Sequence, residues 1–170
     1  MPADSGPKSN AAILEISRVF KAPLASVWAA WSTAENLQKW WGPAGCTLKA
    51  ASLDFRPGGF FHYEMKYSGT PSMWGSFLYR DIVDGERIVW LNSFANARGG
   101  IARAPFAPSF PFEVQNTVTF TSRGAAAVVA LQALPFGATD AEIQAFKDIY
   151  DGMTKGYGAT LDQLEAHLGG

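Results

Sequence analysis

The pattern of apolar and polar positions at the start of the chain predicts a strand and two short helices. Residues 14–20 alternate with period two, which predicts a strand, and Arg18 lies on its apolar face. Pro23 ends this strand and suits the first turn of a helix. Thr33 is placed to cap a second short helix, which Gly42–Pro43 stops.

Six further segments alternate or run apolar between turn residues, and they predict strands at residues 47–55, 60–67, 73–83, 87–94, 115–121 and 125–134. The tight turns between successive segments indicate an antiparallel meander. Asp54 precedes the turn Arg56–Gly59 and is expected to order it. In the strand after this turn, period two directs Tyr63 to one face and His62 to the opposite face, toward solvent.

The alternation breaks between residues 95 and 112, a segment that we call the flap. Three prolines are interleaved there with three phenylalanines. A loop this long in a compact domain is more often a lid or a binding loop than a simple connection. Two interpretations stay open: a mobile lid, or a rigid proline-rich segment packed on the edge of the sheet.

The end of the chain predicts one long amphipathic helix. Thr139 and Glu142 form a capping-box pattern, and apolar residues then recur every three or four positions up to Leu168. This stripe corresponds to a helix of about eight turns. Three glycines between residues 152 and 158 interrupt it and suggest a bend or a close approach to another backbone. A helix this amphipathic must lie across an apolar surface, which the sheet supplies.

Together these elements predict an α+β domain with a curved antiparallel sheet of about six to seven strands wrapped around the C-terminal helix. We expect this single domain at residues 12–170, after a disordered tail at residues 1–11. Tryptophan rarely fills a small core completely, so a tryptophan cluster often borders a cavity. Such a cluster lies in and around the two short helices: Trp28, Trp31, Trp40 and Trp41.

Composition narrows the classes of function. The formal net charge of −1 argues against a nucleic-acid or anionic-membrane partner. Cys46 is the single cysteine, so the chain forms no intrachain disulfide, and His62 and His167 are too few for a histidine-rich metal site. No apolar run approaches the ~20 residues that span a bilayer. We therefore expect a cytoplasmic protein without a metal or another cofactor.

Several motifs then occur in an order that is typical of one protein family. They are Arg18, Ala22–Pro23, Val27–Trp31, Leu37–Pro43, Arg56–Gly59, Met65, Gly75-x-Phe77 and Gly156–Leu168. In this order the chain resembles the SRPBCC (START/Bet v 1-like) superfamily, and within it the activator of Hsp90 ATPase homologue 1-like branch, over nearly its whole length. The resemblance implies a helix-grip fold around an apolar pocket. Tyr157 stands where this branch usually has a tryptophan, which keeps an aromatic ring toward the cavity.

The leading hypothesis for function is binding of an apolar, aromatic or polyketide-like small molecule, with the flap as a lid. Asn116 lies on an inward strand face and offers a hydrogen bond, and Arg18 either anchors an acidic ligand or lies at a strand end. The walls of the pocket are expected to be Trp31, Trp41, Phe61, Tyr63, Met65, Phe77, Met153 and Tyr157.

Two other classes of function remain as alternatives. A cyclase- or hydrolase-like enzyme would use Arg18, Tyr79 and Asn116, although the chain has no Gly-x-Ser-x-Gly nucleophile turn. The resemblance also implies a third class, a co-chaperone module for Hsp90, which we rank last because that partnership belongs to longer proteins. The flap phenylalanines and the sheet edges suggest a homodimer as a further partner.

Overall fold

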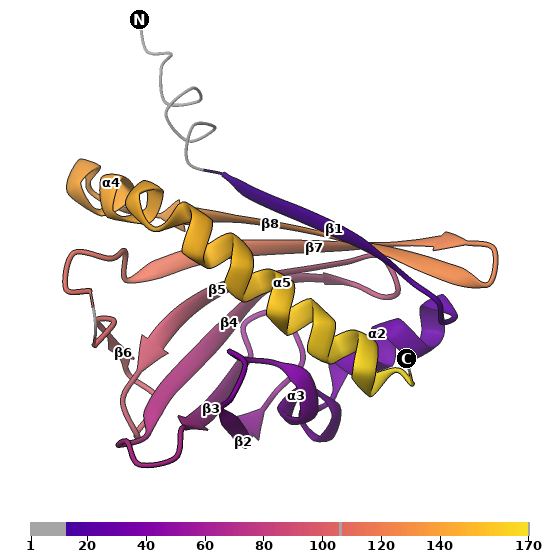
Figure 1. Cartoon of the computed structure of the whole chain (residues 1–170), viewed down its shortest axis with the longest axis horizontal. Helices are drawn as coiled ribbons and strands as arrows, with labels where there is room; N and C mark the ends of the chain where they lie inside the picture. Colours follow the sequence, from indigo (N-terminus) through magenta and orange to yellow (C-terminus); the bar gives the residue numbers. More distant parts are fainter. Residues whose placement is uncertain (1–12, 106, 170) are drawn as a thin grey trace, which may run out of the picture.

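The computed structural model describes residues 13–105 and 107–169, so the tail expected at residues 1–11 lies outside the described part. Within it, eight strands form one antiparallel sheet (Figure 1). The strands are β1 (Leu14–Phe20), β2 (Thr47–Leu53), β3 (Phe60–Lys66), β4 (Met73–Val83), β5 (Arg87–Ala95), β6 (Ile101–Ala102), β7 (Glu113–Arg123) and β8 (Ala126–Phe136). The sequence predicted all of these except the two-residue strand β6.

The sheet order is β1-β8-β7-β5-β4-β3-β2, with β6 paired to β5. Shifts of register in the β2–β3 pair near Ala50 and in the β4–β5 pair near Tyr79 mark β-bulges or irregularities. Bulges increase the local twist of a strand pair and bend it. The curvature directs one face of every long strand toward the same interior.

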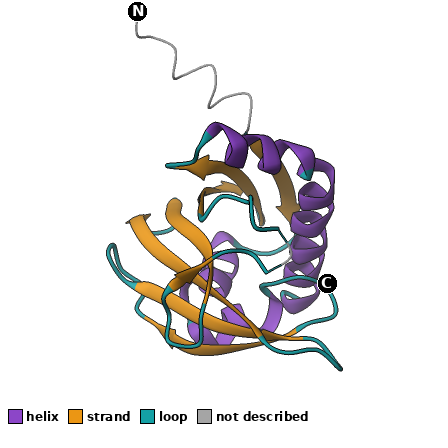
Figure 2. Ribbon diagram, turned by 90° about the vertical axis from the view of Figure 1, so that its left-hand side faces the viewer, coloured by secondary structure: helices purple, strands orange, loops and turns teal. Residues whose placement is uncertain are grey.

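Four helices accompany the sheet in the described residues: α2 (Leu24–Ser32), α3 (Ala34–Trp40), α4 (Asp140–Asp148) and α5 (Tyr150–His167). Helix α5 runs diagonally across the sheet, as Figure 1 shows, and in the turned view of Figure 2 the helix that ends near the C-terminus runs along one side of the strands. The predicted caps are present: Thr33 accepts a hydrogen bond from the backbone N–H of Asn36, and Thr139 and Glu142 form a reciprocal capping box.

The long C-terminal helix differs from its prediction in one respect. The chain leaves helical geometry at Ile149 (φ −110°, ψ 17°), which divides it into α4 and α5. Helix α5 continues without a break through Gly152, Gly156 and Gly158. A Cβ atom at Gly152 or Gly156 would meet nothing within 4 Å, so no other backbone approaches closely at these two glycines. A straight helix from residue 140 to 167 would measure roughly 40 Å, and the break lets each half follow the curved sheet.

Side chains from opposite ends of the chain fix α5 in place. Arg18 on β1 forms an ion pair with Asp162 and donates to the carbonyl oxygen of Gly158 over 3.4 Å. At the next position of α5, the Gln163 amide donates to the carbonyl oxygens of Trp40 and Gly42 over 2.8 and 2.9 Å. The helix is therefore held against both β1 and the end of α3.

The turn before β3 confirms the expected role of Asp54. Arg56 Nε donates to Asp54 Oδ2 over 2.8 Å, and a Cβ atom at Gly59 would lie 2.0 Å from the Asp54 carbonyl oxygen. Only glycine therefore fits where this turn enters the strand. The Gly59 carbonyl oxygen accepts from the Tyr79 backbone N–H over 2.9 Å, which joins the turn to β4.

Candidate functional site

A cavity of about 250 Å³ lies between the concave face of the sheet and α5. We call it the inner cavity. Its wall is formed by strands β3, β5 and β7, the end of α3, the flap, helix α5 and the break before this helix. The lining residues are Trp41, Gly42, Pro43, Tyr63, Met65, Asn92, Ser93, Phe94, Phe110, Val114, Ile149, Met153, Gly156, Tyr157 and Thr160.

Two tyrosine hydroxyl groups on this wall have fixed partners. Tyr157 donates its hydroxyl proton to Asn116 Oδ1 over 2.9 Å, and Asn116 Nδ2 donates to the carbonyl oxygen of Val114 over 3.3 Å. Trp41 Nε1 donates to the Tyr63 hydroxyl oxygen over 3.4 Å. These bonds orient both phenol rings in a mostly apolar wall, whose other polar side chains are those of Asn92, Ser93 and Thr160.

The inner cavity is electrically neutral. None of its lining residues is an acid, a lysine, an arginine or a histidine. Burial raises the pKa of the Tyr63 phenol, and a hydrogen bond from Trp41 opposes this effect. Burial likewise raises the pKa of the Tyr157 phenol, against a hydrogen bond with Asn116. Both phenols therefore stay protonated at neutral pH, and a charged ligand group would find no counter-ion among the lining residues.

Five of the residues expected to form the pocket line the inner cavity: Trp41, Tyr63, Met65, Met153 and Tyr157. Asn116 is fully buried and meets the cavity wall through its hydrogen bond with Tyr157. These are the expected residues that the structure brings together. Their grouping follows from period two along β3 and from the helical stripe of α5.

The other expected pocket residues lie elsewhere. Trp31, Phe61, Phe77 and Tyr79 are at most 2% exposed and belong to the packed core beside the cavity. Phe77 stacks on Trp90 at 4.6 Å between ring centroids. Arg18 lies outside the cavity lining, in its ion pairs with Asp162 and Glu165 of α5. The periodicity of the sequence predicted the inward direction of these side chains. It did not distinguish residues of the packed core from residues of the cavity wall.

Several lining residues were not anticipated, and two of them come from irregular segments. Phe110 reaches the cavity from the flap and stacks on Phe146 of α4 at 6.2 Å between centroids. Ile149 lies at the break between α4 and α5. Asn92 and Phe94 lie on β5, whose inward face carries Trp90. Period-two alternation from Trp90 could have predicted that both residues face inward.

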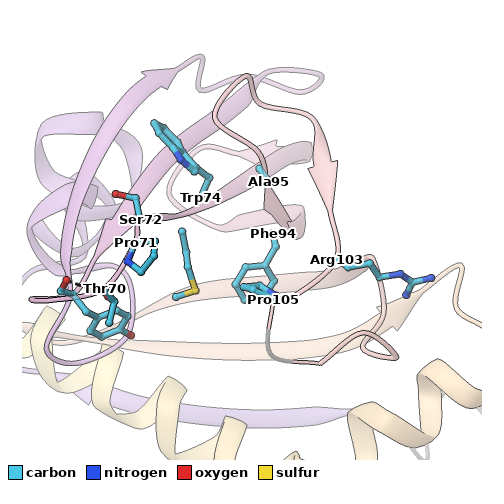
Figure 3. Close-up of a pocket in the computed structure, with 10 residues that line it drawn as sticks. Thr70, Pro71, Ser72, Trp74, Phe94, Ala95, Arg103 and Pro105 are labelled. Atoms are coloured by element: carbon cyan, nitrogen blue, oxygen red, sulfur yellow. Dashed lines mark hydrogen bonds between the residues drawn. The ribbon is translucent and has the colours of Figure 1, made fainter.

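A second, outer cavity of about 530 Å³ adjoins the first, and Phe94 lines both. Figure 3 shows Thr70, Pro71 and Ser72 on one side of it, with Phe94, Pro105 and Arg103 on the other. Its lining residues are Tyr67, Thr70, Pro71, Ser72, Met73, Trp74, Phe94, Ala95, Arg103 and Pro105. The flap therefore contributes to both cavities.

Arg103 ties the flap to helix α4. Its Nη1 donates to Glu142 Oε2 over 2.7 Å and to the carbonyl oxygen of Phe110 over 2.9 Å. Its guanidinium carbon also lies 3.7 Å from the ring centroid of Phe112. One side chain thus connects both arms of the flap with the first turn of α4. Within the described residues, the flap is packed on the sheet through the β5–β6 pairing.

The Glu142 carboxylate gives this connection a dependence on pH. The hydrogen bond from the Thr139 backbone N–H, and then the one from Arg103, hold the pKa of Glu142 below its usual range. Because the folded-state pKa is lowered, ionised Glu142 stabilises the fold above its unfolded pKa of about 4.3. That stabilisation is lost as the pH falls through the folded-state pKa.

We expect Glu142→Gln to lower the melting temperature at neutral pH and to have a progressively smaller effect in acid. Glutamine keeps part of the capping box but removes the charge that pairs with Arg103. Melting curves of both proteins across the acid range measure this. A difference in melting temperature that stays constant with pH would contradict the assigned role of the carboxylate.

The geometry defines a class of protein: an α+β helix-grip fold with an apolar cavity under its long C-terminal helix. The sequence also matches the family described as activator of Hsp90 ATPase homolog 1-like protein over residues 21–169. The chain therefore belongs to this family, as its motifs predicted. A search of curated proteins gave no match.

Solved structures share the fold across most of their length. A crystal structure from Mycobacterium smegmatis is 22% identical, with a TM-score of 0.74 over 94% of this chain and 92% of the other. A solution structure from Arthrobacter aurescens is 21% identical, with a TM-score of 0.79 over 94% and 87% of the two chains. A crystal structure from Chromobacterium violaceum is 22% identical, with a TM-score of 0.70 over 93% and 97%. At this identity they show the fold alone.

Two further features bear on the class of site. Among the described residues, no group of three or more histidine, cysteine, aspartate or glutamate side chains is arranged to hold a metal ion. In the same part of the chain, no helix has both the length and the apolar character needed to cross a membrane.

Proposed function

We propose that the inner cavity binds an apolar, uncharged small molecule. The observation that supports this most directly is the cavity itself, about 250 Å³ in volume, with aromatic rings and methionines in its wall. A smaller apolar cavity of about 150 Å³ suffices to bind benzene. The inner cavity therefore has room for a ligand of roughly two fused rings.

The flap serves in this proposal as the lid of the site. Phe110 forms part of the inner wall, and Arg103 and Pro105 form part of the outer cavity. A ligand that passes from the outer to the inner cavity meets Phe94, which lines both. Opening of the flap then requires that Arg103 release Glu142.

Tetralin, a neutral bicyclic hydrocarbon, is a suitable probe for this proposal. Trp41 lines the cavity, so bound tetralin should change tryptophan emission and raise the melting temperature. A titration followed by both signals measures the affinity. If neither signal changes in a solution saturated with tetralin, the proposed function is overturned.

Filling the cavity should abolish this binding. Met153 lines it from α5, and Met153→Trp puts a large ring into the space that the probe needs. We expect the variant to fold and its affinity for tetralin to fall at least about tenfold, measured by calorimetry. Lys155→Trp on the exposed face of the same helix is the matched control and should bind normally. Equal affinities of the two variants would place the probe elsewhere.

The enzyme alternative has less support from the site. Arg18 lies in ion pairs with α5, and Tyr79 is buried in the core. Of its three proposed polar groups, only Asn116 has a hydrogen bond to the cavity wall. The family description names an activator of the Hsp90 ATPase, and the cavity gives no reason to assign that activity to this chain.

A further inference from the structure

The hydrogen bonds around the inner cavity decide which tyrosine can donate a proton to a ligand. Asn116 Nδ2 donates to the Val114 carbonyl oxygen, which directs Oδ1 of the same amide toward Tyr157. An amide oxygen only accepts, so the hydroxyl proton of Tyr157 must point to Asn116. Tyr157 therefore presents to the cavity an oxygen that can only accept.

Tyr63 has the opposite character. The indole Nε1–H of Trp41 is a donor only, so the Tyr63 oxygen accepts from it and keeps its own proton available. Across the described residues, no oxygen accepts a hydrogen bond from the Tyr63 hydroxyl group in the structure. Tyr63 is 3% exposed, and a donor buried without an acceptor is unfavourable. This proton is a donor at the cavity wall without an acceptor, and the buried Asn92 Oδ1 is an acceptor of the same lining without a donor among the described residues.

The ring of Tyr63 is also fixed in position. It lies over Gly75, its partner across the β3–β4 ladder, and packs against Phe61 and Phe77 at 4.8 and 5.7 Å between centroids. A Cβ atom at Gly75 would lie 2.4 Å from Tyr63 Cζ. The glycine therefore allows the phenol to lie flat on the sheet with its hydroxyl group at the cavity wall.

We propose that the natural ligand is a neutral ketone whose carbonyl oxygen accepts a hydrogen bond from Tyr63. This inference rests on the proposed function and specifies its ligand. A carboxylate would need a counter-ion, which the lining residues do not offer. An alcohol would bring a proton of its own, which would need the Tyr157 oxygen or Asn92 Oδ1 as a second partner beside Tyr63. A carbonyl group accepts the proton of Tyr63 and needs no second partner.

Three bicyclic probes that differ at one carbon test the proposal: tetralin, 1-tetralone and 1-tetralol. The quantity measured is the ratio of the tetralin dissociation constant to that of each polar probe, in the wild type and in variants. Taking this ratio across variants cancels the different aqueous solubilities of the probes. We expect Tyr63→Phe to lower the ratio for 1-tetralone about fivefold to tenfold, the contribution of one hydrogen bond.

Tyr157→Phe is the matched control. It removes a hydroxyl group from the same cavity, but the proton of this hydroxyl group is already donated to Asn116 Oδ1. We expect it to leave the 1-tetralone ratio unchanged. Three outcomes would each overturn the ketone proposal while tetralin binding still supports the cavity. They are an unchanged 1-tetralone ratio in Tyr63→Phe, a lowered ratio in Tyr157→Phe alone, and tighter binding of 1-tetralol than of 1-tetralone. Failure of all three probes to bind would instead overturn the proposed function.

A measurement on the wild type covers the case in which a variant does not fold. A hydrogen bond to a carbonyl oxygen weakens the C=O bond, so the infrared band of bound 1-tetralone should lie at lower frequency than in an alkane solvent. A band at the alkane position would show an unbonded carbonyl group and would overturn the proposal.

Discussion

Trp31→Ala is expected to lower the free energy of unfolding by about 3–5 kcal/mol, a typical cost of emptying a buried tryptophan site. Trp31 is 1% exposed and lies among four other aromatic rings. Its centroid is 4.7 Å from that of Trp40 and 5.7 Å from that of Phe120. Since these neighbours come from α3 and β7, the deletion removes contacts that join the helices to the sheet.

Chemical denaturation measures this loss, and the melting temperature should fall by about 6–20 °C. Conservative variants distinguish the contribution of the aromatic ring to stability from that of its N–H group. Trp40 Nε1 donates to the Ala30 carbonyl oxygen over 2.9 Å, whereas Trp31 Nε1 has no partner among the described residues. Trp31→Phe should therefore destabilise the protein less than Trp40→Phe. The reverse order would contradict this account of the two indole groups.

The local elements could be predicted because each depends on chemistry close in sequence. The capping box at Thr139 and the turn ordered by Asp54 depend on residues three to five positions away. Period two fixed the inward direction of Tyr63 on β3, and the helical stripe fixed that of Tyr157. These two residues face each other because the fold crosses β3 with α5, which the family motifs implied.

The depth of each ring could not be predicted in the same way. Trp31 and Trp41 both lie on or beside short helices with an inward side, yet Trp31 is in the core and Trp41 lines the cavity. Periodicity gives a direction, whereas depth depends on which distant side chain fills the space ahead. Phe110 shows the same limit, because irregular backbone in the flap has no period from which its contact with Phe146 follows.

The sequence also did not predict which hydroxyl group of the site donates a hydrogen bond and which accepts one. Asn116 was expected to face inward. Which atom of its amide faces Tyr157 depends, however, on the hydrogen bond to the Val114 carbonyl oxygen two residues away on the same strand. The difference between a donating Tyr63 and an accepting Tyr157 arises from two separate hydrogen-bond chains. Two identical side chains thus acquire different roles from their neighbours.

Gly75→Ala is expected to abolish ligand binding by moving Tyr63. The new Cβ atom would lie 2.4 Å from Tyr63 Cζ and 2.5 Å from its hydroxyl oxygen, closer than real contacts allow. Phe61 and Phe77 pack beside the ring, so the space left to it is the inner cavity that it already lines. We expect a stability loss of about 1–3 kcal/mol and at least about a tenfold loss of tetralin affinity.

Two comparisons assign this loss to the ring. Gly152→Ala on the exposed side of α5, where a Cβ atom meets nothing within 4 Å, should bind tetralin normally and be more stable by about 1 kcal/mol. In a Tyr63→Leu background, Gly75→Ala should destabilise the protein less, because the ring that the methyl group displaces is gone. Equal destabilisation in the two backgrounds, measured as a double-mutant cycle, would mean that Gly75 acts through the backbone instead of through Tyr63.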